Sequence, residues 1–398
     1  MRILMLSWEY DPHIIGGMGK HVTELLPSLV KQDVTVDLVT PLYPHTEMVE
    51  RDGGLSIHRV ALPPRTAAGF SEGVRGANET IKEACDSIIE REGTFDLIHN
   101  HDWLTSFAAI QLKHEHRIPL LATVHATERG RGRGELVGPD AQEINDAEWR
   151  LTFEAWRVIC CTHYMAQELQ DYFSTPLDKI EVIPNGIDPE PLSRLASQDL
   201  GDFRAQYAGP EERLVFSVGR IVYEKGMETL VRAVPQVLAR FPQTKFVIAG
   251  KGPELEKLRG LVRQMHLEES VSLPGFISDA DRDRLYCVSD CAVFPSLYEP
   301  FGIVALEAMA ARTPVVVSEV GGLREVVEHG ETGITIWPND VDSCAWGILH
   351  TLEHPDWAQR RVENAYQKVL SVYDWARIAE QTKGVYERVI EERAHTNW

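Results

Sequence analysis

Short β-rich runs alternate with helical stretches along the whole chain. Most of these runs are continuously apolar, without the alternation of a half-exposed strand. They cover residues 2–7, 34–40, 55–60, 95–100, 120–125, 157–162, 179–184, 213–219, 244–250, 271–276, 291–295, 314–318 and 333–337. Near-continuous apolar strands separated by helices indicate parallel sheets covered on both faces. The sequence therefore predicts an α/β protein with doubly wound topology in both halves.

With 398 residues the chain is long enough for two domains of ordinary size. Residues 184–202, rich in Pro, Gly, Asp and Ser, follow one β-rich run and precede a fresh one at Leu214. We therefore expect a first Rossmann-like domain over residues 1–190 and a second over 191–373, facing each other across a cleft. Residues 374–398 have the pattern of an amphipathic helix, which we expect to pack back on the first domain.

Composition excludes several classes of protein. The chain is 43% hydrophobic and 25% charged, as expected of a globular protein, and its net charge of −20 argues against nucleic acid or anionic membranes as partners. No apolar run approaches the roughly 18 residues that span a bilayer, and the amino terminus lacks the organisation of a signal peptide. We expect a soluble, cytoplasmic protein.

Six cysteines occur without a CxxC pair, which favours reduced, mostly buried thiols over a disulfide framework. Cys287 and Cys291 are four residues apart and could hold a metal ion on one helix. No histidine or acidic cluster near them completes such a site, so we expect free thiols.

The stretch SLYEPFGIVALEAMAARTPVV, residues 296–316, places two carboxylates among apolar residues. Glu299 precedes a helix expected to begin near Phe301, and the backbone N–H groups of residues 301–304 would form a first turn that attracts an anion such as phosphate. Glu307 lies inside that helix with no basic residue nearby in the sequence to compensate its charge. Ligand hydroxyls, such as those of a ribose, would suit Glu307. The alternatives are a capping acid at Glu299 and a solvent-facing acid at Glu307.

Two cations follow the first strand of the second half, in FSVGRIVYEKGMETLVRAV. Arg220 lies at the carboxyl end of that strand, and Lys225 comes five residues later, just before a helix. Together they could neutralise a diphosphate leaving group, or they are solvated loop cations. Gly250 and Gly252 end the next strand, where they permit either close approach of the backbone to a ligand or simply a turn.

Another strand-to-helix junction, HIIGGMGKHV, carries Gly16, Gly17 and Gly19. These glycines could form a flexible loop that approaches a ligand closely, or a structural turn. The loop is not a Walker A phosphate loop, because Ile14 replaces the leading glycine and His21 replaces the serine or threonine after the lysine.

Three further patterns could be metal sites. In HNHDW, alternation along a strand sends His99 and His101 to one face, where they could bind a metal ion with Asp102, although no usual third ligand set is evident. DADRD at 279–283 and DVD at 340–342 match the loose DxD pattern of metal-dependent transferases of another fold. Both precede helical segments, so acids at a helix N-terminus explain them better. We expect no metal and no cofactor.

ERGRGRGEL, residues 128–136, places Arg129, Arg131 and Arg133 among glycines. The segment could touch RNA, which the net charge disfavours, or form a mobile solvated loop. A sharper hypothesis is that it closes over an acceptor, since arginines are natural ligands for a sugar phosphate.

Three motifs, in this order, resemble the retaining glycosyltransferases of family 4, which have the GT-B fold. They are GGMG near the start, GRIVYEKG in mid-chain and EPFGIVALE late in the sequence. The resemblance covers nearly the whole chain, and the combination is more specific than any one motif. HNHDW and TVHATE look further like the glycogen and starch synthases and their maltosyl-phosphate-forming relatives.

The resemblance implies roles for the matching residues. Arg220 and Lys225 would bind the diphosphate of a nucleotide sugar and stabilise its charge as it leaves, while Glu299 would contact the donor hexose. Glu307 would hold the ribose hydroxyls, and His125 would contact the hydroxymethyl group of the donor sugar. The implied donor-binding residues are Gly16, Gly17, Gly250, Pro300, Phe301, Gly302, Ile303, Val304 and Glu307.

The chain departs from the longer bacterial glycogen synthases at three places. Ile14 stands where they carry lysine, and Lys20 stands where they carry aspartate. Pro300 and Phe301 replace their cysteine after the first glutamate of the late motif. These departures leave the donor base and glucan elongation open.

Together the motifs predict a metal-independent retaining hexosyltransferase whose donor is a nucleotide sugar, ADP-glucose or UDP-glucose being the leading choices. The first expectation for the acceptor is an α-glucan or maltooligosaccharide, toward which Asp102 and Trp103 would lie. The second is glucose 1-phosphate, which would give maltose 1-phosphate. The rivals are a GT-B nucleotide-sugar 2-epimerase, which needs no acceptor, and a non-enzymatic glucan-binding protein, which would explain neither the two cations nor Glu307.

Overall fold

The computed structural model describes residues 1–63 and 70–398, and the chain divides into two compact units. Unit 1 comprises Met1–Gly186 and Trp375–Trp398, and unit 2 comprises Ile187–Asp374. The division after Gly186 falls inside the Pro- and Gly-rich segment that suggested a domain boundary. The carboxyl-terminal helix belongs to unit 1.

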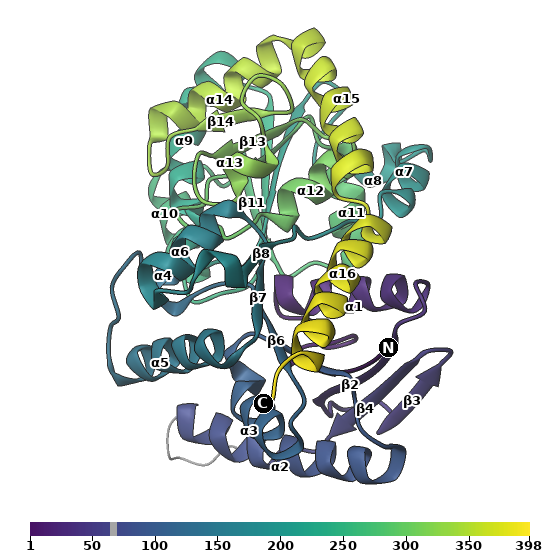
Figure 1. The fold of residues 1–398 in the computed structure, drawn as a ribbon. Coiled ribbons are helices and arrows are strands. Elements are labelled where there is room, and N and C mark those ends of the chain that lie inside the picture. The colour runs from purple at the N-terminus through teal and green to yellow at the C-terminus, as the bar shows by residue number, and fades with distance from the viewer. Residues whose placement is uncertain (64–69) are drawn as a thin grey trace. The chain divides into compact units, whose positions relative to one another are not determined.

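Unit 1 is built on an eight-stranded sheet in the order β3-β4-β2-β1-β5-β6-β7-β8 (Figure 1). Its strands are β1 (Arg2–Leu6), β2 (Thr35–Pro41), β3 (Val49–Asp52), β4 (Leu55–Val60), β5 (Leu97–His101), β6 (Leu120–Val124), β7 (Arg157–Cys160) and β8 (Ile180–Val182). All neighbours are parallel except β3 and β4. The chain starts in the middle of the sheet, and the direction of winding reverses between β1 and β5, as in doubly wound folds.

Helices complete unit 1. They are α1 (Gly17–Val30), α2 (Phe70–Glu92), α3 (Ser106–His116), α4 (Glu128–Arg131), α5 (Pro139–Glu154), α6 (His163–Phe173) and α16 (Trp375–Ala394), with short 3-10 turns at Trp103–Thr105 and Leu177–Lys179. Helix α16, yellow in Figure 1, lies beside α1. Ile378 and Tyr386 of α16 are fully buried in the same apolar core as Ile3 and Leu25, so this helix is an integral part of unit 1.

Unit 2 has a six-stranded, wholly parallel sheet in the order β11-β10-β9-β12-β13-β14. Its strands are β9 (Arg213–Val218), β10 (Thr244–Ala249), β11 (Val271–Gly275), β12 (Cys291–Phe294), β13 (Val315–Ser318) and β14 (Ile334–Ile336). Its helices are α7 (Glu190–Ala196), α8 (Gly201–Arg204), α9 (Met227–Arg240), α10 (Leu255–Gln264), α11 (Asp279–Val288), α12 (Ile303–Ala310), α13 (Leu323–Val326), α14 (Val341–Glu353) and α15 (Pro355–Val372), with a 3-10 turn, η3, at Tyr223–Lys225. Here the winding reverses between β9 and β12.

The predicted α/β class and doubly wound topology are confirmed in both units, and each predicted β-rich run contains a strand. The strand that the sequence did not reveal is β3, whose residues VERD are polar and largely exposed at the sheet edge. Among the described helices, none has the length and apolar character needed to cross a membrane.

One local expectation was wrong. Helix α12 begins at Ile303 and not near Phe301, because Gly302 takes the N-cap position with a φ of 110°. The alternative of a shared helix for Cys287 and Cys291 is excluded, since Cys287 lies on α11 and Cys291 opens β12. None of the six cysteines, all of them described, forms a disulfide, and all but the partly exposed Cys287 are buried, as the sequence predicted.

Candidate active site

Each unit gathers its candidate residues where doubly wound sheets bind ligands, outside the carboxyl ends of the strands at the reversal of winding. In unit 1, β1 leads into the glycine loop, β5 ends before Asp102, and β6 ends before His125. In unit 2, β9 leads to Arg220, and β12 leads within a few residues to Glu299. The sequence therefore delivers the two sets to the places where the fold presents side chains to a ligand.

The central feature of unit 2 is an ion pair between two predicted residues. Lys225 Nζ lies 2.6 Å from Glu299 Oε2, and Ser296 Oγ donates to the same oxygen at 3.2 Å. Glu299 is only 8% exposed, so water screens the pair poorly. The lysine and the serine together fix the orientation of the carboxylate and compensate its charge.

Glycine lets these two loops come together. Gly226, which follows Lys225, has a φ of 64°, and a Cβ there would lie 2.0 Å from the Pro295 carbonyl oxygen. The Leu297 backbone N–H also donates to the Glu224 carbonyl oxygen at 2.7 Å, which joins η3 to the loop after β12. Close packing of backbone on backbone thus brings Lys225 to Glu299.

Arg220 is held more loosely than Lys225. Its side chain is half exposed, and Nη2 lies 3.5 Å from Glu224 Oε1, a surface pair of small energetic value. Arg220 therefore keeps the freedom to turn toward an anion at the end of β9.

Gly250 has a structural explanation. Its φ is 144°, and a Cβ at this position would lie 1.8 Å from the Gly219 carbonyl oxygen. The same is true of Gly252, where a Cβ would lie 2.1 Å from the Ile221 carbonyl oxygen. Both glycines let the ends of β9 and β10 approach each other, and the donor-binding role of Gly250 stays a prediction.

The start of α12 offers backbone groups to a ligand. The first-turn amides of Ile303 and Val304 have no intrahelical partner, as at the start of any α-helix. The N-cap residue, Gly302, has no side chain that could accept from them. The Phe301 side chain is buried and packs 6.0 Å from the Tyr373 ring, centroid to centroid. Pro300 has no N–H, so only the later residues of the predicted segment can donate to an anion.

Glu307 has partners within unit 2. The carboxylate is 4% exposed and accepts a hydrogen bond from Tyr286 Oη at 3.0 Å, while Arg282 Nη1 lies 3.9 Å from its other oxygen. Burial and the neighbouring Glu307 raise the pKa of Tyr286 well above its usual value. Residues distant in sequence therefore compensate the Glu307 carboxylate. The alternative of a solvent-facing acid at Glu307 was wrong, because the side chain is buried. Its role in holding a ribose stays a prediction.

Replacing Tyr286 with Phe should lower the free energy of unfolding of unit 2 by about 1.5–3 kcal/mol, since it removes a hydrogen bond to a buried carboxylate. The matched control is Tyr366→Phe, which loses a hydroxyl contact with neutral Ser193 at 2.9 Å and should cost about 1 kcal/mol or less. Amide exchange in the β9–β12 core measures both. Equal losses in the two variants would mean that Glu307 does not depend on Tyr286.

In unit 1 the glycine loop is fixed by an unforeseen residue. Glu9 Oε2 accepts the backbone N–H groups of Ile15 at 2.8 Å and of Gly16 at 3.0 Å. A Cβ on Gly19 would lie 2.8 Å from Glu9 Cβ and Oε2, which accounts for the last glycine of the motif. Gly16 is the N-cap of α1 in an extended conformation, and Gly17 is its first residue. The loop is therefore ordered by a buried carboxylate.

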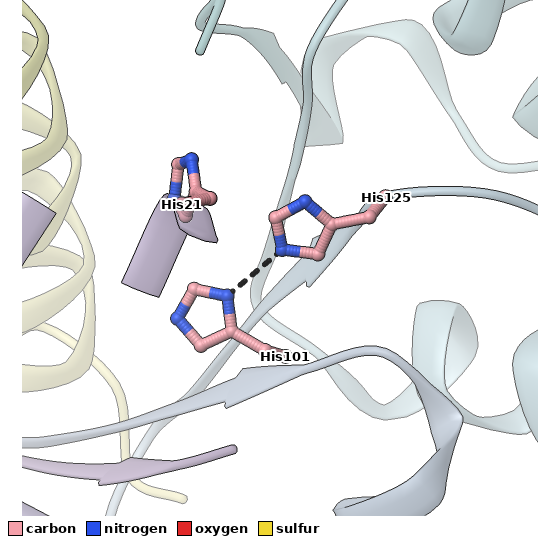
Figure 2. A group of neighbouring side chains, drawn as sticks. All are labelled: His21, His101 and His125. Carbon is pink, nitrogen blue, oxygen red and sulfur yellow. Dashed lines mark hydrogen bonds between the residues drawn. The ribbon is translucent and has the colours of Figure 1, made fainter. Parts of the chain in front are cut away.

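His125, which is partly exposed, belongs to a cluster of imidazoles with the buried His21 and His101 (Figure 2). His101 Nδ1 lies 3.0 Å from His125 Nε2, and the His21 and His125 ring centroids are 4.9 Å apart. Burial lowers the pKa of His125 to about 3, so the ring is neutral near pH 7. A neutral imidazole can donate or accept one hydrogen bond with a sugar hydroxyl.

Asp102 and Trp103 serve the architecture of unit 1. Asp102 Oδ1 accepts the backbone N–H of His125 at 2.7 Å, and burial raises the pKa of Asp102 to about 6. Trp103 is buried in an apolar cluster with Val74 and Ile144. Asp102 thus anchors the residue that follows β6, and the acceptor roles of both residues stay predictions.

The Arg-Gly segment begins with a helical turn, α4, that two residues hold in place. Thr127 caps the short helix α4 by accepting the Gly130 N–H at 3.0 Å, and buried Glu148 accepts the Glu128 N–H through both oxygens at 3.0 and 2.9 Å. Residues 128–131 therefore form a capped helical turn, while the exposed residues 132–135 follow it. For residues 128–136 as a whole, the alternatives of a solvated loop and of closure over an acceptor both stay predictions.

The three arginines of this segment differ in their surroundings. Arg129 lies over the Tyr172 ring, 5.4 Å from its centroid, and Arg131 lies 3.5 Å from Glu128. Arg133, which follows α4, is exposed and has a φ of 52°.

The structure explains the three patterns HNHDW, DADRD and DVD, which were considered above as metal sites. His99 and His101 do share a face of β5, with ring centroids 4.3 Å apart, but both ring nitrogens of His99 are hydrogen-bonded, to Tyr386 Oη and Thr123 Oγ1. His99, His101 and Asp102 therefore do not converge on a metal site. Asp279 and Asp281 lie in the first turn of α11, and Asp340 caps α14, as acids at helix N-termini should.

Several residues of the site escaped the sequence motifs. Glu9, Tyr286 and Arg282 act on predicted residues from other elements, and His21 had been noted only as a departure from a phosphate loop. Asn185, which lies 2.7 Å from His21 Nδ1, follows β8. A signal existed for Glu9 alone, an acid directly after an apolar strand and before a glycine loop.

Comparison with known proteins agrees with this fold and identifies the family. A family model described as Glycosyltransferase Family 4 matches residues 15–191, and one described as Glycosyl transferases group 1 matches residues 202–368. A glycogen synthase of Mycobacterium tuberculosis is 35% identical over 97% of this chain and 94% of its own length. An alpha-maltose-1-phosphate synthase of Mycolicibacterium smegmatis is 30% identical over 98% and 100%.

Among solved structures, a sucrose-phosphate synthase from Thermosynechococcus elongatus superimposes with a TM-score of 0.85 at 28% identity, covering 98% of this chain and 99% of its own. Two units, each built on a doubly wound α/β sheet, together with this structural similarity define a GT-B glycosyltransferase. The chain belongs to the family 4 glycosyltransferases.

Proposed function

We propose that this glycosyltransferase moves a hexosyl group, with glucose as first candidate, from a nucleotide sugar to an α-glucan or maltooligosaccharide, retaining the α configuration. The observation that carries the proposal is the Lys225–Glu299 pair, a cation and a carboxylate 2.6 Å apart at the reversal of winding in unit 2. The similarity to a glycogen synthase over nearly the whole chain supports the acceptor class. ADP-glucose and UDP-glucose are the donors to test first.

In this proposal the residues of unit 2 bind the donor. Arg220 and Lys225 neutralise the diphosphate, the amides of Ile303 and Val304 donate to its oxygens, and Glu307 accepts from the ribose hydroxyls. Glu299 accepts from the hexose hydroxyls, and in unit 1 His125 contacts the hydroxymethyl group. Two cations suffice to compensate the charge of the leaving diphosphate, so the proposal requires no metal ion.

The chemistry breaks the bond from the anomeric carbon to the diphosphate oxygen and forms a bond from that carbon to the acceptor oxygen. The transition state resembles an oxocarbenium ion, as in glycoside hydrolysis. We favour attack on the face from which the diphosphate leaves. The acceptor hydroxyl then gives its proton to the departing phosphate oxygen, and the nucleoside diphosphate is released. Trapping of a glycosyl-enzyme adduct would contradict this route.

A nucleotide-release assay tests the proposal. ADP-, UDP- and GDP-sugars are each combined with glycogen, maltooligosaccharides, glucose 1-phosphate and no acceptor, and the products are identified by mass. We expect acceptor-dependent release and a glucan longer by one hexose. Epimerised sugar without any acceptor would favour a nucleotide-sugar 2-epimerase, and absence of turnover with every pair would refute the substrate class.

A phosphorylated acceptor is the second candidate. The arginines at 129, 131 and 133 follow closely after His125, and arginine binds phosphate through paired hydrogen bonds. Two of the similar proteins are named as synthases of a sugar phosphate, alpha-maltose-1-phosphate and sucrose-phosphate. Glucose 1-phosphate is therefore the alternative acceptor, and its product would be maltose 1-phosphate.

Replacing all three arginines with Ala should raise the KM for a phosphorylated acceptor by about tenfold or more, because each charge-assisted hydrogen bond is worth about 1.5–3 kcal/mol. The KM for the donor should change far less. Arg150→Ala, an exposed arginine on α5, is the matched control and should leave both values unchanged. Equal rises in the KM for the acceptor and the KM for the donor would show that the three arginines do not bind the acceptor.

A further inference from the structure

Three imidazoles from separate elements converge inside unit 1 (Figure 2). His21 comes from α1, His101 ends β5, and His125 follows β6. Each offers a ring nitrogen, and these three nitrogens lie within 4.8 Å of one another. His21 and His101 are buried, and His125 is partly exposed.

We propose that His21, His101 and His125 form a binding site for a divalent transition-metal ion such as Zn²⁺. Imidazole nitrogen is a preferred ligand of Zn²⁺, Cu²⁺ and Ni²⁺. Three histidines with a fourth position left for water make a common zinc site, with Zn–N distances of about 2.0–2.1 Å. The ligand nitrogens need to move by an ångström or so to reach these distances.

His21 is already oriented as a metal ligand. Its Nδ1 lies 2.7 Å from Asn185 Oδ1, and an amide oxygen can only accept, so Nδ1 carries the proton. Nε2 of His21 is then left with its lone pair. Donation from the second ring nitrogen to an oxygen acceptor is the usual support of a metal-binding histidine.

The contact between His101 and His125 points the same way. The 3.0 Å separation between His101 Nδ1 and His125 Nε2 is close to the distance between two ligands of one tetrahedral ion. An ion bound there replaces the hydrogen bond between the two rings. His101 then coordinates through Nδ1 and carries its proton on Nε2, which is buried with no hydrogen-bond partner in the described part of the chain.

The protonation state suits metal binding. Burial lowers the pKa of His21 and His125 to about 3, and it lowers the pKa of His101 well below its usual value. All three rings are therefore neutral near pH 7, and a metal ion does not have to displace a proton from a cationic imidazole. His99 lies beside them but is excluded, since both of its ring nitrogens are hydrogen-bonded.

The site has a functional consequence that rests on the proposed function. His125 is the ring assigned to the donor sugar, and a metal ion on that ring withdraws its lone pair from the substrate. Because His125 is the partly exposed member, an ion reaches the cluster from its side. Zn²⁺ should therefore be a reversible inhibitor of the transferase.

Calorimetric titration of the chelator-stripped full chain with ZnCl₂ tests the site directly, and Co²⁺ absorption reports the coordination number. We expect one ion per chain, bound at least tenfold more weakly by His21→Gln and by His125→Ala. If His21→Gln does not fold, His125→Ala alone tests whether the cluster binds the ion. His116→Ala is the matched control, because His116 belongs to a separate, more exposed group with Asp86 and Glu115. Undiminished binding by both test variants, or binding abolished in the control, would overturn the proposal.

An activity measurement separates the two claims. Zn²⁺ should stop nucleotide release by the unmodified protein, and EDTA should restore it. A filled site without inhibition would overturn the inhibitory role. If no donor and acceptor pair turns over, the proposed function fails while the calorimetric result still decides the metal site.

Discussion

Replacing Lys225 with alanine should lower kcat by about 10²–10³-fold, the usual effect of removing one preorganised group that stabilises charge in a transition state. Lys225 is the cation assigned to the departing diphosphate, and its ammonium lies 2.6 Å from Glu299. Single-turnover measurement of nucleotide release with saturating donor checks the rate of the chemical step. Arg232→Ala, which breaks an exposed ion pair with Glu228 on α9, should leave kcat unchanged.

Stability measurements on variants of the Lys225–Glu299 pair distinguish a catalytic role of the pair from a purely structural one. Lys225→Ala leaves the buried Glu299 carboxylate with less compensation, which should cost about 1–3 kcal/mol of unfolding free energy. In the double variant Lys225→Met with Glu299→Gln both charges are gone, so we expect most of that stability to return while the activity stays low. Recovery of activity together with stability would show that the pair serves only the packing of unit 2.

The class of the fold could be predicted because its strands are buried on both faces and therefore read as apolar runs. Strand β3 could not, since its polar residues pair at an exposed edge and leave no hydrophobic pattern. The start of α12 was misplaced because the sequence does not show that Gly302 takes a φ of 110° against Leu323. Backbone conformations that depend on tertiary packing cannot be predicted from local sequence patterns.

In the candidate site too, some features could be predicted from the sequence and others could not. Lys225 and Glu299 could be named from their positions after strands, because the topology brings the carboxyl ends of β9 and β12 to one edge. The direct contact between Lys225 and Glu299 could not be predicted, because it depends on the close approach of two loops. That approach requires glycine at position 226, where any Cβ would lie 2.0 Å from the Pro295 carbonyl oxygen. The partners of Glu307 were missed because Tyr286 lies 21 residues away in sequence.

Glu148 should make unit 1 less stable as the pH rises. Burial raises the pKa of this carboxyl from 4.5 to about 8, against the opposing effect of Arg131. The folded state therefore holds a proton that the unfolded state has lost, and stability falls between pH 4.5 and about 8. The expected slope from this group is about 1.4 kcal/mol for each pH unit inside that window. Amide exchange in β6 measures it locally.

Glu148→Gln isolates the effect. Glutamine carries no titrating proton and can still accept the Glu128 N–H, so the variant should gain stability over the unmodified protein as the pH rises through the window. The exposed Glu143→Gln on the same helix is the control and should run parallel to the unmodified protein. A parallel curve for Glu148→Gln as well would mean that Glu148 is charged in the folded state. Arg131 would then compensate it, and the segment after His125 would depend on that ion pair for its order.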